Sequence, residues 1–372
     1  MKERTALFDN AKAILIWLVV FGHLIDLVCA SDSGDGIRYL FLVIWSFHMP
    51  AFIFLAGLFD HRRDAFPKGR VLYFVIVGLV LKIVNMLVLL VFPDVEADPF
   101  LFGDKNFPWF MFVLAAFVAM AYGLEKVGSE LRQRGLLGDS VTSGYSPASG
   151  SKSGANGSEM TVNGTPAADR VYWGWVFAIV LAVSLAVGFL PWVGDVLYLS
   201  RIFVLFPVYV MGYMLQPADV VRVVERPAVR FAGAFGFVGM LAIFWVKLDL
   251  MYHLRPLFTG RNAYSAWGLA HGGPWLRLAA YAVSALMVFG FLCLVPRKES
   301  YLSRIGQGSL SVYVFHYYVI FLLDGLDIID ALATQRLRTM LPTFALIATV
   351  EVLVFSGKWL SDRLTKPITS YK

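Results

Sequence analysis

Residues 8–24 read FDNAKAILIWLVVFGHL, an apolar stretch that carries three titratable side chains, Asp9, Lys12 and His23. A helix that crosses a bilayer needs about 20 consecutive, mostly apolar residues. Charged and titratable side chains at membrane depth are costly and usually serve a function. The stretch therefore predicts a membrane-spanning helix over about 11–30 that contributes to a functional site.

The same apolar character extends over the whole chain. Of its 372 residues 58% are hydrophobic and only 16% are charged, and the mean hydropathy is +0.68. Soluble globular domains carry about 25% charged residues, so this composition excludes them. We predict an all-α, polytopic transmembrane bundle that forms a single domain over residues 1–372. Ten spanning helices are expected, at about 11–30, 38–58, 70–92, 107–124, 171–190, 200–215, 230–250, 276–295, 308–323 and 340–357.

Two of these predicted spans, 200–215 and 308–323, are short for a bilayer crossing and are candidates for tilted or partly re-entrant segments. A further region differs in composition, because residues 139–168 are rich in Ser, Gly and Ala and lack periodicity. Such a tract is typical of a flexible linker. We therefore expect a flexible cytoplasmic insert there.

The positive charges predict the orientation of the chain. With the ten spans in place, 22 of the 32 Lys and Arg residues fall on the side of the N-terminus and 8 fall on the opposite side. Cytoplasmic loops of membrane proteins carry an excess of Lys and Arg, so both termini are expected in the cytoplasm. The net charge of +6 follows this topology and does not indicate nucleic-acid binding.

No motif indicates a metal site or a permanently bound cofactor. The two cysteines, Cys29 and Cys293, adjoin apolar runs and lack the spacing of metal ligands. Neither a Gly-rich phosphate loop nor a Ser-centred nucleophile elbow is present. The candidates for function are therefore the polar side chains at membrane depth.

Lys12 and His23 share one face of the first predicted helix. At about 100° per residue they lie within roughly 20° of each other, and at about 1.5 Å per residue they are roughly 16 Å apart along the axis. Such a face can hold an anionic cytosolic ligand at Lys12 and present the other end of that ligand to His23. The structural alternative is that Lys12 extends to the membrane surface and His23 packs against a helix carbonyl.

Histidines occur in two further predicted spans. His48 lies in the middle of the second span, beside a proline kink, where it contributes to a site or satisfies backbone carbonyls that the kink frees. In the ninth span Ser309, Tyr313 and His316 share a face. That stripe indicates the lining of a polar pocket or path, with hydrogen bonds between packed helices as the alternative.

Three more polar residues are candidates. Arg201 begins the sixth span, either as an anchor at the outer surface or as part of a site. Glu351 lies inside the last span and needs a partner, so an ion pair with Lys82 and a role in catalysis are both open. Asp26 follows His23 by one turn, where it could orient a neighbouring group.

These motifs, in this order, resemble the integral-membrane acyltransferase 3 family, and within it the fucose 4-O-acetylase-like branch. Four segments are similar to segments of that family: the acid, base, ten residues and His of the first span, FHMPAFIFLAG at 47–57, RIFVLFPVYVMGYML at 201–215, and GQGSLSVYVFHY at 306–317. The likeness covers most of the chain apart from 139–168. Lys12 departs from the commoner Arg, and Ala56 departs from the usual Ser.

The resemblance implies transfer of an acyl group, most simply acetyl, from cytosolic acyl-CoA to a hydroxyl of an extracytoplasmic sugar, polysaccharide or glycolipid. Together with the 139–168 insert and the basic loops, it points to a bacterial cytoplasmic membrane. We expect His23 to act as general base, with a covalent acyl-histidine as a variant. The groups expected to bind the CoA phosphates are Lys12 and the basic loop 62–70, in particular Arg62 and Arg63. Those expected to line the acceptor side or polarise the carbonyl are His48, Arg201, Ser309, Tyr313 and His316. Structural or orienting roles are expected for Asp9, Asp26 and Glu351.

Two other functions are compatible with the sequence. A membrane transporter or flippase for a sugar-linked or anionic substrate would use the same polar residues as a path, although no inverted repeat is evident. A non-catalytic scaffold with a degenerate site would account for the departures at Lys12 and Ala56. Acetyl transfer without net movement of substrate separates the enzyme from the transporter, and stabilisation by CoA separates it from the scaffold.

Overall fold

The computed structural model describes residues 6–29, 34–60, 65–93, 108–136, 167–193, 197–261, 263–269 and 271–370, which are helical and contain no β-strand. The long helices are α1 (Ala6–Leu27), α2 (Asp35–Leu58), α3 (Lys68–Val91), α4 (Trp109–Gln133), α5 (Ala167–Val187), α6 (Leu199–Tyr213), α8 (Pro227–Val246), α11 (Gly273–Leu294), α13 (Ser309–Gly325), α15 (Leu337–Phe355) and α16 (Lys358–Ser370). The shorter elements are η1 (Pro191–Val193), α7 (Pro217–Val224), α9 (Leu248–His253), α10 (Pro256–Thr259), η2 (Tyr264–Trp267), α12 (Tyr301–Gln307) and α14 (Ile328–Ala333). The insert predicted at 139–168 lies, apart from its last two residues, outside the described part of the chain.

The predicted all-α polytopic bundle is confirmed. Eight helices in the described ranges are long and apolar enough to cross a membrane, namely α1, α2, α3, α4, α5, α8, α11 and α15. Two bent pairs bring the number to ten if each pair is one span: α6 with α7, bent by 82°, and α12 with α13, bent by 75°. The bent pairs contain the two short predicted spans, 200–215 and 308–323.

The two bends have local causes. α7 begins at Pro217, which lacks an N–H, and the preceding Gln216 is extended (φ −97°, ψ 138°), so α6 cannot continue through it. Gly308 separates α12 from α13, and a Cβ at this position would lie 2.5 Å from the carbonyl oxygen of Ser356 at the end of α15. The close approach of the two backbones therefore requires glycine where the chain bends.

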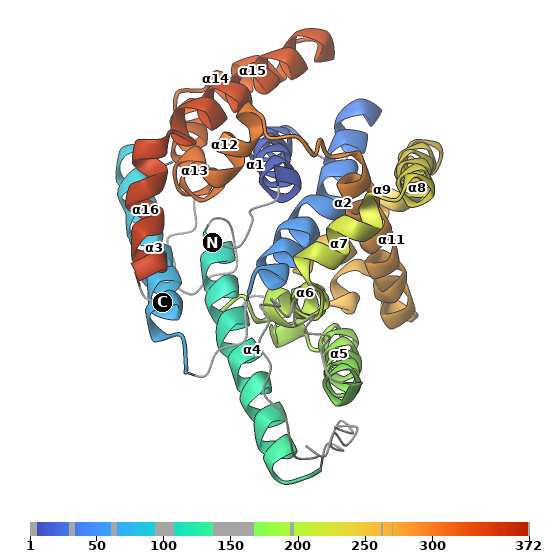
Figure 1. Ribbon diagram of the computed structural model, residues 1–372. Helices are drawn as coiled ribbons and strands as arrows, with labels where there is room; N and C mark the ends of the chain where they lie inside the picture. The colour runs from blue at the N-terminus through green and yellow to red at the C-terminus, as the bar shows by residue number, and fades with distance from the viewer. Residues whose placement is uncertain are drawn as a thin grey trace, which may run out of the picture.

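α1 and α2 form the centre of the bundle. α1 packs against α2, α12, α13 and α15, and α2 packs against α6 and α11 (Figure 1). In their most apolar windows 61% of the residues of α1 and 67% of those of α2 are buried, against 11% for α8 and 22% for α5. Polar side chains on α1 and α2 therefore face protein instead of lipid, which lowers their cost at membrane depth.

α2 and α6 touch through their backbones at one level of the bundle. A Cβ at Gly57 would overlap the carbonyl oxygen of Tyr209, and a Cβ at Gly212 would overlap the carbonyl oxygen of Phe54. Small residues that allow such close approach are typical of helix pairs in membranes. The contact fixes the spacing of two helices that flank the site described below.

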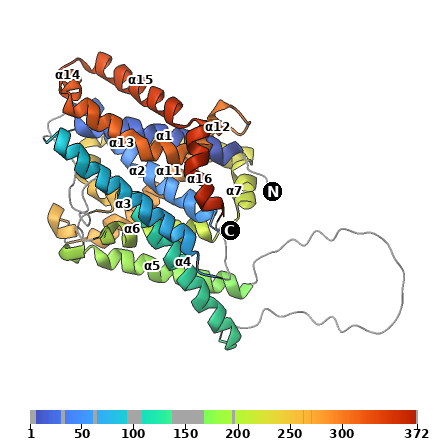
Figure 2. The same ribbon diagram turned by 90° about the vertical axis from the view of Figure 1, so that its left-hand side faces the viewer.

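The start of α1 lies at the same end of the bundle as α7, α12 and α16, whereas α14 lies at the opposite end (Figure 2). Buried Asn10 anchors this start. Its Nδ2 donates to the carbonyl oxygens of Pro296 at 2.8 Å and Lys298 at 3.0 Å, and its Oδ1 accepts from Ser303 Oγ at 2.7 Å. The first turn of α1 is thereby tied to α12 and to the segment that leads into it.

Candidate functional site

Two cavities lie along the polar face of α1. The larger, of about 370 Å³, is named the Lys12 cavity, and its polar lining residues are Asp9, Lys12, Arg70, Ser309 and Tyr313. The smaller, of about 110 Å³, is named the His23 cavity, and its polar and aromatic lining residues are His23, Asp26, Trp45, His48, Trp109, Arg201, Phe258, Thr259, Arg261, Tyr313 and Tyr317. Both cavities are built mainly from α1, α2 and α13. α4 also contributes to both, and α6 and α10 contribute to the His23 cavity.

The two cavities share a wall. Val19, Met49 and Tyr313 line both of them. Val19 follows Lys12 by about two helical turns and precedes His23 by about one, so all three lie on the same face of α1. The face predicted from the sequence therefore runs from one cavity, past the shared wall, into the other.

His23 is surrounded by aromatic rings and by a second histidine. Its ring centroid lies 5.5 Å from that of His316, 4.9 Å from that of Tyr317 and 6.0 Å from that of Trp45. The Nδ1 atom of His23 is buried and has no hydrogen-bond partner among the described residues. The structural alternative, in which His23 binds a helix carbonyl, is not found there, and the imidazole is available to take a proton from a ligand.

His48 and His316 each use one ring nitrogen to bind the backbone of their own helix. His48 Nδ1 lies 2.6 Å from the carbonyl oxygen of Ile44, and His316 Nδ1 lies 2.8 Å from that of Tyr313. Because a carbonyl oxygen only accepts, Nδ1 carries the hydrogen in each neutral ring. His48 thus satisfies a backbone carbonyl of its own helix and also lines the His23 cavity. His316 is fully buried, and its ring stacks on that of His23.

Two guanidinium groups belong to the His23 cavity. Arg201 is only 6% exposed and its Cζ lies 4.5 Å from the ring centroid of Trp109, so it is part of the cavity and not an anchor at the membrane surface. Arg261, in the loop after α10, is the second. Asp26 is the one acidic residue among the described residues of the lining. Nothing in the sequence marks Arg261 as part of a site, because a basic residue in a loop has no periodicity.

Lys12 forms an ion pair within its own helix. Its Nζ lies 2.6 Å from Oδ1 of Asp9, and the Asp9 side chain is 5% exposed. Gln307 Nε2 donates to the other oxygen of this carboxylate at 3.2 Å. Asp9 therefore orients the ammonium group, which stays partly exposed along the wall of the Lys12 cavity.

Arg70 of α3 is a second cation of the Lys12 cavity. Its Nη1 lies 2.7 Å from Oδ1 of Asp60, and the other oxygen of this buried carboxylate accepts from the hydroxyl of Tyr209. The predicted Arg62 and Arg63 lie outside the described residues. Arg70 ends the basic loop 62–70 that the sequence associates with donor binding, but its link to Asp60 becomes evident only once α2 and α3 are packed.

The structure also places Glu351 and Ser309. Of the two roles that the sequence leaves open for Glu351, the ion pair with Lys82 is not formed. Lys82 Nζ lies 6.0 Å from the ring centroid of Tyr198, and both carboxylate oxygens of Glu351 are buried without a hydrogen-bond partner in the described part of the chain. Ser309, expected to line the acceptor side or to polarise the carbonyl, lines the Lys12 cavity, because the bend before α13 places its first turn at that level.

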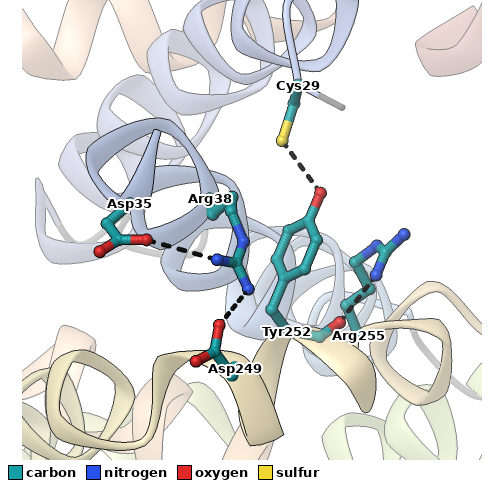
Figure 3. A network of polar contacts seen from close by, with 6 residues as sticks. All are labelled: Cys29, Asp35, Arg38, Asp249, Tyr252 and Arg255. Atoms are coloured by element: carbon teal, nitrogen blue, oxygen red, sulfur yellow. Dashed lines mark hydrogen bonds and ion pairs between the residues drawn. The ribbon is translucent and has the colours of Figure 1, made fainter. Parts of the chain in front are cut away.

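A polar cluster holds α9 against the end of α1 and the start of α2 (Figure 3). Tyr252 lies between two guanidinium groups. Its ring centroid is 4.7 Å from the Cζ of Arg38 and 4.0 Å from the Cζ of Arg255. Its hydroxyl lies 3.3 Å from the Cys29 thiol, and Arg38 also pairs with Asp249 at 2.6 Å. Burial raises the pKa of Tyr252 to about 12 and also raises the pKa of the Cys29 thiol, so both groups are protonated near neutral pH. The cluster is a structural support for the segment that leads to the His23 cavity.

No curated protein and no solved structure matches the chain. The acyltransferase domain of the acyltransferase 3 family matches residues 6–357. This match includes every helix that lines the two cavities. It confirms, at the level of the family, the resemblance that the sequence motifs indicate. The chain therefore belongs to the acyltransferase 3 family and is a membrane acyltransferase.

Proposed function

We propose that the protein is an O-acyltransferase, and more narrowly an O-acetyltransferase of the fucose 4-O-acetylase-like branch. Cytosolic acyl-CoA binds in the Lys12 cavity, and a hydroxyl of an extracytoplasmic sugar, polysaccharide or glycolipid enters the His23 cavity. One observation carries the proposal: a cavity with cations and a cavity with histidines meet at a wall made of Val19, Met49 and Tyr313.

The Lys12 cavity suits a donor with an anionic end and a less polar arm. Lys12 and Arg70 supply cations for the CoA phosphates, and apolar side chains such as Phe52 and Leu55 line the rest. Its volume of about 370 Å³ falls in the range of about 300–1,000 Å³ that is common for small-molecule sites. Ala56 also lines this cavity, so the hydroxyl that the family usually has at this position is missing here.

The His23 cavity suits only the reacting end of an acceptor. Its volume of about 110 Å³ is below the roughly 300 Å³ of a complete small-molecule site, so most of a polysaccharide or glycolipid stays outside. Trp45, Trp109 and Tyr317 line it with aromatic rings, which pack well against molecules with one apolar and one polar side. A single sugar hydroxyl can therefore reach His23 while the remainder of the acceptor stays at the surface.

The chemistry is a direct transfer. The acceptor hydroxyl gives its proton to the imidazole of His23 while its oxygen attacks the carbonyl carbon of the thioester. Arg201 stabilises the negative charge on the carbonyl oxygen. The carbon–sulfur bond then breaks, the ester stays with the acceptor, and the CoA sulfur takes the proton back from His23. His316 is a positioning residue, because it stacks on His23 without lining the cavity.

Acetyl transfer in inverted membrane vesicles tests the proposal, with labelled acetyl-CoA outside and a glycolipid fraction present. His23→Ala is expected to lower the label on glycan by about 10²- to 10⁴-fold. The matched control is His253→Ala, an exposed histidine of α9, which keeps the wild-type rate. If His23→Ala transfers acetyl groups at the wild-type rate, His23 is not the general base. Movement of acceptor across the vesicle membrane without acylation would indicate the transporter or flippase instead.

The proposed direction of transfer requires both termini on the cytoplasmic side of a bacterial cytoplasmic membrane, which the excess of Lys and Arg supports. Single-cysteine variants test it in a background that lacks Cys29 and Cys293. A membrane-impermeant maleimide should label Ser265→Cys in intact cells and Leu136→Cys only after lysis, since both positions are exposed. The reverse pattern would contradict the orientation and, with it, the assignment of donor and acceptor cavities.

A further inference from the structure

The His23 cavity carries more positive charge than the proposed transfer needs. Arg201 alone can stabilise the single negative charge that develops on the carbonyl oxygen. Arg261 lines the same cavity, is half-buried and forms no ion pair with any residue that the structure describes. Asp26 is the one carboxylate among the described lining residues. A guanidinium that is partly shielded from water interacts more strongly with an opposite charge in the same cavity than it would in bulk water.

One hydrogen bond brings both guanidinium groups to the same cavity. The Oγ of Ser200 donates to the carbonyl oxygen of Gly260 at 2.9 Å, and this bond is buried. Each partner is the direct chain neighbour of one arginine, Arg201 or Arg261. Gly260 has a left-handed backbone (φ +66°), which favours glycine, so the loop turns at the point where α6 holds it.

Tyr264, three residues after Arg261, is also held in place. The N–H of Tyr264 donates to the carbonyl oxygen of Gly188 at 2.8 Å, and its hydroxyl donates to that of Leu185 at 3.0 Å. The Cζ of buried Arg277 lies 4.5 Å from the ring centroid of Tyr264. Because Gly260 is held to α6 and Tyr264 is held at α5 and α11, a ligand that binds Arg261 meets a site whose described neighbours are already ordered.

We propose that the acceptor carries a fixed negative charge close to its reacting hydroxyl, and that Arg261 binds this charge. The inference rests on the proposed acyl transfer and names the class of acceptor, which is an acidic sugar with a carboxylate or a phosphate group. A guanidinium forms paired hydrogen bonds with either group. Bound in this way, the acceptor compensates the second cation of the cavity and leaves Arg201 to the thioester carbonyl.

The test compares three acceptors that share one ring and one aglycone: a neutral hexoside, its uronic acid and its 6-phosphate. The full-length protein in proteoliposomes is expected to use at least one acidic acceptor about 10- to 100-fold better than the neutral one in kcat/KM, the range of one charged hydrogen-bonded contact. Arg261→Gln should bring this ratio close to 1, and Arg261→Lys should give an intermediate ratio. Arg336→Gln, an exposed arginine before α15, is the control and keeps the wild-type ratio. The better acidic acceptor identifies the charged group.

Binding without turnover separates this inference from the proposed function. In the absence of acyl-CoA, an acidic glycoside should raise the thermal stability of the wild type and of Arg336→Gln, but not of Arg261→Gln. Such stabilisation with no acylation of any acceptor would refute the acyl transfer and keep the anion site. Equal use of neutral and acidic acceptors by the wild type, or an unchanged ratio in Arg261→Gln, would overturn the inference.

Discussion

The backbone contact between α2 and α6 makes a sharp prediction about Gly57. In Gly57→Ala the new Cβ would overlap the carbonyl oxygen of Tyr209 and would lie 3.0 Å from its carbonyl carbon and 3.1 Å from the backbone N of Tyr213. Ordinary Cβ contacts lie at 3.4–4 Å. All three neighbouring atoms belong to the backbone, so no side-chain rotation can relieve the overlap and the two helices must move apart.

The magnitude follows from two opposing effects. Overpacking a well-packed contact typically costs about 1–3 kcal/mol, and an overlap of backbone with backbone belongs at the upper end of that range. Replacing glycine by alanine within a helix returns up to about 1 kcal/mol. Gly123→Ala in α4 is the matched control, because a Cβ at Gly123 meets nothing within 4 Å. Since both variants gain the helical preference of alanine, their difference in unfolding free energy isolates the overlap, at about 3 kcal/mol.

The assay is unfolding of the two variants in mixed micelles, followed by tryptophan fluorescence. We expect Gly57→Ala to lose about 2 kcal/mol relative to the wild type and Gly123→Ala to gain up to about 1 kcal/mol. Acyl transfer should fall with Gly57→Ala, because α2 carries Met49 of the shared wall and α6 carries Arg201. Equal stability of the two variants would refute the reasoning that backbone contact sets the spacing of α2 and α6.

Three further changes test the charged residues. Lys12→Met should lower the unfolding free energy by about 2 kcal/mol, because it removes the cation beside the buried carboxylate of Asp9. Adding Asp9→Asn should restore most of the loss in a double-mutant cycle, and additive losses would contradict the pairing. Asp60→Asn should raise KM for acyl-CoA about tenfold with little change in kcat, because it releases Arg70; a fall in kcat alone would argue against a role in donor binding. Glu351→Gln should raise the unfolding free energy by about 1 kcal/mol in the same micelles, because a buried carboxylate without hydrogen bonds is costly; a loss of stability would show that the carboxylate is satisfied in the membrane.

The positions of the spanning helices could be predicted from the sequence because membrane insertion depends on a local quantity, the length of an apolar run. All ten predicted ranges coincide with helices, and the two shortest, 200–215 and 308–323, lie within the two bent pairs. The sharpness of the bends could not be predicted. The first bend depends on Pro217, at which α6 cannot continue. The second depends on the backbone of Ser356, which lies close to Gly308.

Some residues of the candidate site could likewise be predicted from the sequence, whereas others depend on how the helices pack. Lys12 and His23 lie on one face because helical periodicity is local, and the structure places that face along both cavities. Arg70 belongs to the basic loop 62–70 that was expected to bind the donor, and it lines the Lys12 cavity. Arg261 could not be assigned, because it reaches the His23 cavity only when the loop after α10 packs against the centre. Of the two roles that the sequence leaves open for Glu351, the ion pair with Lys82 is not formed, since two charges at similar depth in different spans need not become neighbours.

By itself, the sequence determined the class of the fold, the ten apolar segments, the polar face of the first helix and, through ordered motifs, the acyltransferase 3 family. Each of these depends on residues that are close in the chain. Only the tertiary structure decided that two cavities meet at Val19, Met49 and Tyr313, which cations belong to each cavity, and that His316 lies behind His23. Those features depend on the packing of helices that are distant in sequence, and helical periodicity does not specify which faces pack together.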